Sequence, residues 1–154
     1  MRTRSIKVST TAVGNVGTGE DNLITFAMPG DVLYTNNDGF RFVMAGTFAA
    51  NANNKQVRAY FGATIIANTG VIAHNGGAWR LEGEVLRTGA TAQISNALIT
   101  YTTALGASAT GTMYATPAET LANSITLKAT GEATSNDDII QKYLVVSPIA
   151  YTAA

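Results

Sequence analysis

The sequence contains no cysteine, a single histidine and only three prolines in 154 residues. Without cysteine the chain forms neither disulfides nor thiolate metal sites, and its redox compartment stays undetermined. The one histidine, His74, leaves little room for the arrangements in which a histidine activates a nucleophile. The scarcity of proline excludes a rigid proline-rich linker.

Charge is also scarce, since 13% of the residues are charged, against about 25% in a typical soluble domain. Ten lysines and arginines balance ten aspartates and glutamates, so the formal net charge is zero. A DNA-binding protein normally carries a basic excess, and we therefore expect no nucleic-acid partner. A neutral, weakly charged surface instead favours burial against copies of the chain itself or against a partner protein.

Long apolar runs are absent as well. The basic start MRTRSIKVST is followed by no apolar stretch of signal-peptide length. No segment approaches the roughly 20 apolar residues of a membrane span. We therefore expect no signal peptide, no membrane partner, and one domain of ordinary size. That domain is predicted over residues 13–154, after a basic N-terminal arm and first strand at residues 1–12.

What the chain does contain is an alternation of apolar and polar residues, set among the alanine, threonine, glycine and asparagine that form nearly half of it. Such period-two alternation is typical of strands with one buried face. It indicates strands at 5–10, 40–45, 57–61, 79–85 and 125–129, with further candidates at 23–28, 94–102, 112–115 and 139–146. The last run is apolar on both faces, which predicts a strand covered from both sides.

Turn residues lie between these runs, at 36–39, 51–54, 75–77 and 135–138. About nine or ten short strands with few helix candidates predict an all-β fold, an antiparallel β-sandwich of jelly-roll-like plan. Segment 117–122 begins with proline and is left open between a short helix and a loop. Five side chains are predicted to be buried: Phe42, Trp79, Leu81, Val85 and Leu127.

Candidate chemistry is sparse. No nucleophile-elbow motif occurs, and the glycine-rich run 14–19 lacks the lysine of a phosphate-binding loop, so it is interpreted as a flexible connection. The acidic residues form two predicted loop clusters, Glu20 with Asp21, and Glu132 with Asp137 and Asp138. They are interpreted as solvated turn residues, with a weak calcium site and carboxylate catalysis as the alternatives. We expect no catalytic residue, no cofactor, no metal and no small-molecule substrate, and hence no enzyme.

Three stretches carry a family resemblance: VGNVGTGEDNL at 13–23, GTFAANANNKQVRAYFG at 46–62 and GAWRLEGEVLRTGAT at 77–91. Together they resemble small virion structural proteins of tailed bacteriophages, and the similarity covers most of the chain. The resemblance implies a β-sandwich, commonly trimeric, that serves as a building block of the particle. Its most recognisable parts are a loop and a strand with its turn, so it identifies a kind of module and no chemistry.

On this resemblance, we expect a capsid decoration (cement) protein of the virion, assembled in the host cytoplasm. It would bind the outer head surface as a homotrimer and stabilise the shell formed by the major capsid protein. A short chain without a shaft or heptad repeat favours this reading. The alternative is a tail-fibre or receptor-binding tip, which the loops rich in asparagine and tyrosine favour. A carbohydrate-active enzyme is a distant third.

The N-terminus supplies one candidate site. Arg2, Arg4 and Lys7 form a small basic arm, interpreted either as a solvated terminus or as an element that docks on an acidic neighbour. In a decoration protein these three residues are the candidate capsid-docking arm.

Overall fold

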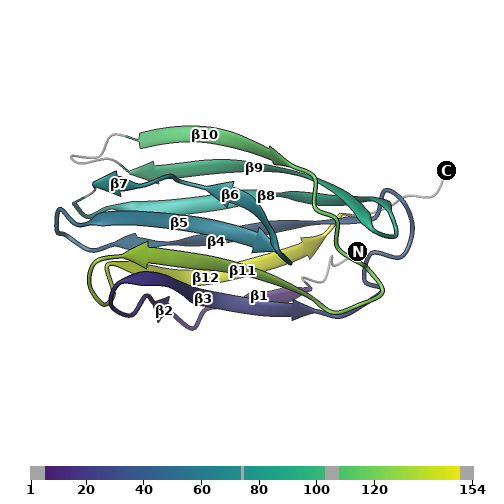
Figure 1. Ribbon diagram of the computed structural model, residues 1–154, viewed down its shortest axis with the longest axis horizontal. Coiled ribbons are helices and arrows are strands. Elements are labelled where there is room, and N and C mark those ends of the chain that lie inside the picture. Colours follow the sequence, from purple (N-terminus) through teal and green to yellow (C-terminus); the bar gives the residue numbers. More distant parts are fainter. Residues whose placement is uncertain (1–5, 74, 103–107, 150–154) are drawn as a thin grey trace.

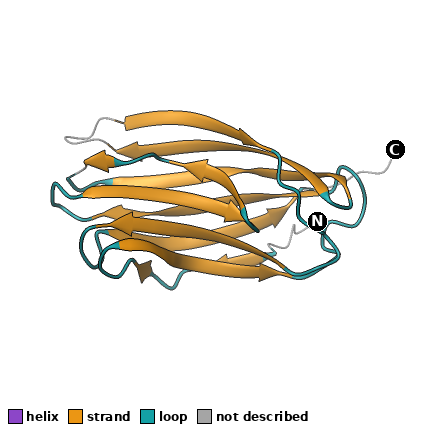
Figure 2. Ribbon diagram, viewed as in Figure 1, coloured by secondary structure: helices purple, strands orange, loops and turns teal. Residues whose placement is uncertain are grey.

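The computed structural model describes residues 6–73, 75–102 and 108–149. In this part of the chain the regular structure is all strand and no residue is helical (Figure 2). Accordingly, the described residues include no helix long and apolar enough to cross a membrane. The strands are β1 (Lys7–Ser9), β2 (Val13–Gly14), β3 (Gly19–Met28), β4 (Gly39–Phe48), β5 (Asn54–Phe61), β6 (Thr64–Asn68), β7 (Ile72–Ala73), β8 (Ala78–Gly89), β9 (Ala92–Thr102), β10 (Ser108–Ala115), β11 (Ile125–Ala133) and β12 (Ile139–Pro148).

The strands form two antiparallel sheets that pack face to face (Figure 1). The seven-stranded sheet has the order β1-β12-β4-β8-β9-β10, with β2 paired to β12. The five-stranded sheet has the order β3-β11-β5-β6, with β7 paired to β5. The chain passes back and forth between the sheets, and the strand order is that of a jelly roll extended at one edge by β9 and β10. The predicted antiparallel β-sandwich is therefore confirmed.

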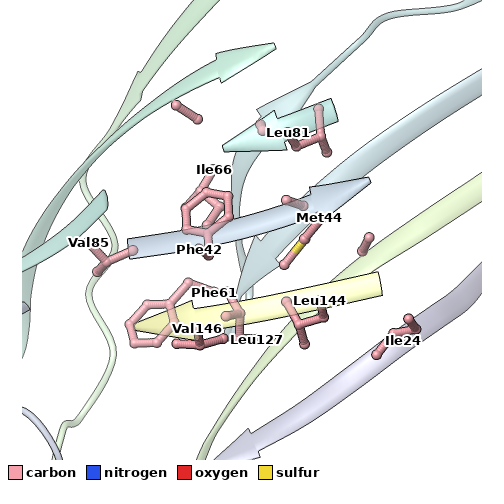
Figure 3. Packing of buried hydrophobic residues seen from close by; sticks show 14 of the residues in the cluster. Ile24, Phe42, Met44, Phe61, Ile66, Leu81, Val85, Leu127, Leu144 and Val146 are labelled. Atoms are coloured by element: carbon pink, nitrogen blue, oxygen red, sulfur yellow. The ribbon is translucent and has the colours of Figure 1, made fainter. Parts of the chain in front are cut away.

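The hydrophobic core lies between the two sheets, where the apolar residues of each alternating strand point inward. All five side chains predicted to be buried are exposed by 2% or less. Figure 3 draws inward-facing side chains of both sheets, among them Phe42 and Leu81 from the seven-stranded sheet and Phe61 and Leu127 from the other. The rings of Phe40 and Phe61 meet across the sheets with their centroids 5.5 Å apart. Period-two patterning alone thus identifies the inward face of most strands.

Segment 117–122 forms no helix and crosses the end of the sandwich as an irregular loop. The side chain of Gln93 in β9 holds this loop by accepting from the backbone N–H of Glu119 and donating to its carbonyl, both at 2.9 Å. The N–H of Leu121 donates to the carbonyl of Ala90 at 3.0 Å. These bonds to neighbouring segments replace the local bonds that a helical turn would need.

β12 is covered on one face only, although its sequence predicts cover on both. Its inward residues Leu144 and Val146 are fully buried. On the outward face Val145 is half-buried, and Lys142 is exposed. The outward face of β12 is therefore only partly covered, and the predicted burial on both sides is wrong for this strand.

Candidate functional site

The predicted docking arm is only partly described, because Arg2 and Arg4 lie outside the described residues. Lys7 lies in β1, half-buried, opposite Val146 of β12. The N–H of Ile6 donates to the Val146 carbonyl at 2.7 Å. Lys7 is therefore held in the seven-stranded sheet, and the docking role of the arm stays a prediction.

His74 also lies outside the described residues, at the predicted turn that leads into β8. In that turn Gly76 and Gly77 have φ of 81° and 95°, a backbone region that favours glycine. The N–H of Gly76 donates to the carbonyl of Ala49 at 2.9 Å, which joins this turn to the end of β4. The predicted turn at 75–77 is thus confirmed for its glycines.

The acidic residues do not form the two predicted loop clusters. Glu20 and Asp21 lie in β3, and Glu132 lies in β11, opposite Glu20 in the strand register. Only Asp137 and Asp138 lie in a turn. Glycine and asparagine near the first three favour loops locally, but antiparallel pairing of β3 with β11 overrides that weak preference.

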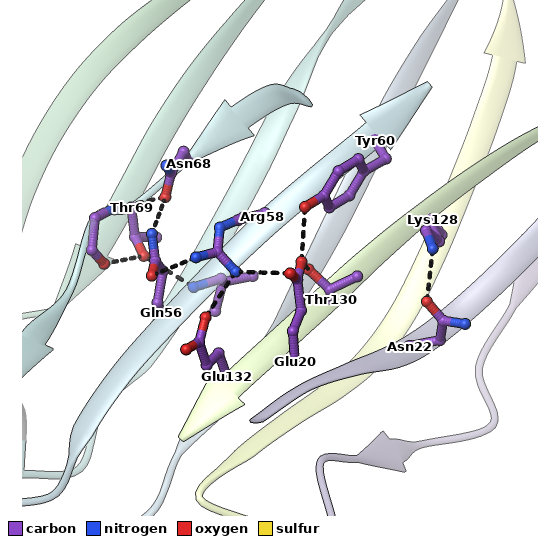
Figure 4. A network of polar contacts seen from close by, with 12 residues as sticks. Glu20, Asn22, Gln56, Arg58, Tyr60, Asn68, Thr69, Lys128, Thr130 and Glu132 are labelled. Carbon is purple, nitrogen blue, oxygen red and sulfur yellow. Dashed lines mark hydrogen bonds and ion pairs between the residues drawn. The ribbon is translucent and has the colours of Figure 1, made fainter. Parts of the chain in front are cut away.

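One arginine joins three strands on the outer face of the five-stranded sheet (Figure 4). Arg58 of β5 lies 3.1 Å from an oxygen of Glu20 and 2.9 Å from an oxygen of Glu132. It also donates to the side-chain oxygen of Gln56 at 2.7 Å. The hydroxyls of Tyr60 and Thr130 donate to Glu20 at 2.7 Å and 2.6 Å. We call Glu20, Gln56, Arg58, Tyr60, Thr130 and Glu132 the arginine network.

The arginine network stabilises the ionised form of Glu20. Partial burial raises the pKa of Glu20, but the hydrogen bonds from Thr130 and Tyr60 and the charge of Arg58 outweigh it, so this pKa lies below its usual value. A carboxyl with a lowered pKa is ionised at neutral pH, whereas a general acid must still hold its proton there. Glu20 therefore serves as a charged partner of Arg58, and the ion pairs of Arg58 with Glu20 and Glu132 link β3, β5 and β11.

A second polar cluster closes the end of the sandwich where the β4–β5 loop meets the β11–β12 turn. Asp138, which is 1% exposed, accepts from the side-chain amides of Asn51 at 2.6 Å and Asn53 at 2.9 Å. The ammonium of the fully buried Lys55 donates to the backbone carbonyls of Asn51 and Asn53 at 3.0 Å and 3.1 Å. It also donates to the side-chain oxygen of Asn51 at 2.9 Å. We call Asn15, Asn51, Asn53, Lys55 and Asp138 the polar end cluster.

Asn15 draws the glycine-rich run 14–19 into this cluster. The Asn15 side chain is fully buried, donates to the carbonyl of Ser135 at 2.9 Å and accepts from the N–H of Ile139 at 2.9 Å. The N–H of Gly17 donates to the side-chain oxygen of Asn136 at 2.6 Å. The interpretation of this run as a flexible connection is therefore wrong, because its polar groups are fixed to the β11–β12 turn.

The polar end cluster includes Asp138, one of the acidic residues for which a weak calcium site was the alternative interpretation. Burial raises the pKa of Asp138, but hydrogen bonds from Asn51, Asn53 and two backbone N–H groups outweigh it and leave this pKa below its usual value. Burial lowers the pKa of Lys55, and the nearby charge of Asp138 opposes that shift only in part. The loop oxygens that suit a calcium ion here accept from the ammonium instead. In the described ranges, no three histidine, aspartate or glutamate side chains come together as a metal site.

Acidification should destabilise the chain through these carboxylates. The pKa values of Glu20 and Asp138 are lowered in the folded state, so their contribution is complete above their unfolded values of about 4 and is lost as pH falls through the lower folded values. We expect the urea midpoint to hold from pH 7 to about pH 5 and to fall steadily below about pH 4. Glu20→Gln should make this fall shallower. An equally steep fall in the variant would remove Glu20 as a cause.

The outer face of the seven-stranded sheet differs from both polar clusters. Strand register places Val8 of β1 beside Val145 of β12, which lies beside Val43 of β4. Leu98 of β9 continues the line beyond Glu82 of β8. We call Val8, Val43, Val145 and Leu98 the apolar row. A shallow groove of about 390 Å³ lies between Val43 and Leu98, at one end of the row, and is also lined by Arg41, Glu82, Glu84 and Asn96.

Sequence reasoning missed the buried Lys55, because a lysine after three asparagines in a turn suggests a solvated position. A signal was present, however. Val57, Ala59 and Phe61 point inward by alternation, and extending that period back by two residues places Lys55 on the same inward face.

The described residues thus define a jelly-roll β-sandwich whose outer faces carry polar and charged side chains, with a short apolar row on the seven-stranded sheet. No family model matches the sequence, and no curated protein matches it. Among solved structures it is similar to one described as the CBM2 module of the evolved Dit of Lactobacillus casei BL23 phage J-1. The TM-score is 0.40 at 12% identity, over 83% of this chain and 70% of that chain. A likeness of this strength carries no conclusion about function.

Proposed function

We propose that this chain is a structural protein of a tailed bacteriophage particle, and within the particle a capsid decoration protein. The observation that supports this proposal is the place of the three resembling stretches in the fold. Residues 13–23 and 46–62 supply Asn15, Asn51, Asn53 and Lys55 of the polar end cluster. Residues 77–91 supply β8, including the core residue Trp79. These stretches hold the sandwich together, as expected of a shared building block.

In this proposal three copies of the chain associate, and the trimer binds the major capsid protein on the outer head surface. The basic arm at Arg2, Arg4 and Lys7 meets an acidic neighbour there. Each exposed ion pair contributes only about 0–1 kcal/mol. The arm therefore acts through many copies on one particle, and its effect weakens as salt rises.

Immunogold electron microscopy of particles of the phage that carries this gene tests the location. We expect gold over the head, at a density of many copies per particle. Gold confined to the tail tip would replace decoration by the tail-fibre alternative. Particles without gold on any part, next to a labelled major capsid protein as the positive control, would overturn the structural role altogether. Particles assembled with Arg2→Ala/Arg4→Ala protein should carry less gold, because these changes remove the arm's charges and leave β1 intact.

One observation favours the tail-tip alternative. Tyr34 is 71% exposed and directly precedes the turn in which Asp38 accepts from the backbone N–H groups of Tyr34 and Thr35 at 2.9 Å and 2.6 Å. An exposed tyrosine beside a fixed polar turn is a composition that adaptable binding surfaces use. Gold at the tail tip would direct attention to this turn as the receptor contact.

A further inference from the structure

The polar end cluster holds an amine against a carboxamide. The Lys55 side chain is fully buried. Its ammonium donates to the side-chain oxygen of Asn51 at 2.9 Å, and to the backbone carbonyls of Asn51 and Asn53 at 3.0 Å and 3.1 Å. A contact of about 3–3.5 Å between a nucleophile and an electrophile is that of two groups held ready to react. An uncharged Lys55 is such a nucleophile, and the side-chain amide of Asn51 is such an electrophile.

The contacts of Lys55 also direct the lone pair that appears when the ammonium loses a proton. A neutral amine keeps two N–H groups. With these on the backbone carbonyls of Asn51 and Asn53, the lone pair faces the side chain of Asn51. The Cγ atom of that side chain is only one C=O bond, about 1.2 Å, from the oxygen that the ammonium contacts. A small shift of Nζ therefore brings it onto the carbon.

The amide of Asn51 is held by different partners at its two ends. Its oxygen accepts a second hydrogen bond, from the backbone N–H of Asn53 at 3.1 Å. This N–H would stabilise the negative charge that forms on the oxygen during an attack on Cγ. Its nitrogen donates to the carboxylate of Asp138 at 2.6 Å. Asp138 is 1% exposed, so an acid–base group stands beside the nitrogen that would leave, shielded from water.

The proton balance makes such a reaction slow at neutral pH. Burial lowers the pKa of Lys55, and the charge of Asp138 opposes this shift only in part, so a neutral amine forms more readily than on an exposed lysine. Hydrogen bonds keep the pKa of Asp138 below its usual value, so the transfer of a proton from Lys55 to Asp138 is unfavourable. The ammonium described above is the state before reaction.

We infer that Lys55 and Asn51 form an isopeptide bond with loss of ammonia, and that Asp138 carries the protons. Asp138 takes a proton from the ammonium. The lone pair of Nζ forms a bond to Cγ, and an electron pair of the C=O bond moves onto Oδ1. When that pair returns, the Cγ–Nδ2 bond breaks.

The protons and charges of this reaction balance without another reactant. The leaving Nδ2 takes the proton from Asp138 and becomes ammonia, and Nζ gives its extra proton to Asp138. That proton leaves with the ammonia as ammonium, so Asp138 ends as a carboxylate. Escape of the ammonium into solvent makes the reaction irreversible.

The bond would give the chain a covalent closure that its composition otherwise excludes, because it contains no cysteine. It joins the β4–β5 loop at Asn51 to the second residue of β5, at the end of the sandwich where Asp138 lies. The inference goes beyond the proposed function and does not depend on it, since the same bond would form in a head protein or a tail protein.

Peptide mapping by mass spectrometry tests this inference. The full chain is kept folded at about pH 9, where more of the amine is neutral than at pH 7, and is then unfolded and digested with trypsin. Before reaction, trypsin cleaves after Arg41, Lys55 and Arg58. After reaction, cleavage after Lys55 should be lost, because an acylated lysine is not a trypsin site. The peptide 42–58 should then appear, lighter by one ammonia.

Three controls accompany the parent protein. The same chain kept unfolded in guanidinium chloride at this pH should still be cleaved after Lys55, because only the fold brings the two groups together. Lys55→Arg and Asn51→Ser each remove one reacting group, and neither variant should yield a linked peptide. Lys142→Arg makes the same lysine change at an exposed position and should react like the parent.

Two results would overturn the isopeptide bond. One is a parent peptide map that stays unchanged after prolonged incubation. The other is a loss of ammonia while trypsin still cleaves after Lys55, which would mean that an asparagine side chain has reacted with the backbone instead. The parent needs no substitution, so its map decides even if circular dichroism shows that a variant has not folded.

Discussion

Replacing Trp79 with alanine should lower the free energy of unfolding by about 3–5 kcal/mol. The indole is 2% exposed and lies against Gly46 of β4, where an added Cβ would approach the ring to 2.8 Å. The backbone of β4 already lies close to the ring, so we expect the surrounding strands to fill little of the space that its removal leaves. Removing the ring therefore loses its packing contacts and leaves a cavity. Urea unfolding followed by far-ultraviolet circular dichroism measures the change without relying on tryptophan fluorescence.

Trp79→Phe is the informative control for this experiment. The buried indole nitrogen has no hydrogen-bond partner among the described residues. Phenylalanine keeps much of the ring and removes that unpaired N–H group, so its cost should be well below that of alanine. A loss under about 0.5 kcal/mol for Trp79→Ala would mean that the ring is not part of a packed core.

Replacing Asp138 with asparagine should cost about 3 kcal/mol or more, although the two side chains have the same shape. The Asp138 carboxylate accepts hydrogen bonds from the side-chain amides of Asn51 and Asn53 and from the backbone N–H of Ser135. Its negative charge also favours the charged form of Lys55 and so opposes the lowering of the Lys55 pKa by burial. An amide turns one acceptor into a donor that faces other donors. It also leaves the buried ammonium without a nearby negative charge.

Asp137→Asn provides the matched comparison one residue earlier. Asp137 has a φ of 58°, a conformation that asparagine adopts readily, and its side chain is exposed. We expect Asp137→Asn to change stability by less than about 0.5 kcal/mol in the same urea experiment. Equal losses at the two positions would mean that the polar end cluster does not depend on the charge of Asp138.

The sequence predicts the sandwich well because its strands obey a local rule. Phe42, Leu81 and Leu127 alternate with polar residues, and alternation fixes which face is buried without knowledge of the partner strand. β6 escaped prediction, because its burial depends on pairing with β5 rather than on alternation within its own five residues.

The polar clusters could not be predicted from local patterns, because they depend on contacts between distant segments. Arg58 reaches Glu20 and Glu132, which are separated from it along the chain by 38 and 74 residues. Asn15 reaches Ser135 across 120 residues. Such partners become neighbours only once the strand order is known, and turn-forming residue types give no hint of burial. The same limit applies to the apolar row, whose members are aligned only by the register between strands.

The pairing of β1 with β12 determines how the molecule bears mechanical load. Lys7 at the start of β1 lies opposite Val146 near the end of β12, and the strands are antiparallel. A force that draws the two ends of the described chain apart acts on one end of this short ladder, so its hydrogen bonds break one after another. A force directed along the strands would instead shear many bonds of a ladder at once. A sandwich with this pairing therefore resists tension along its strands better than tension applied to its two ends.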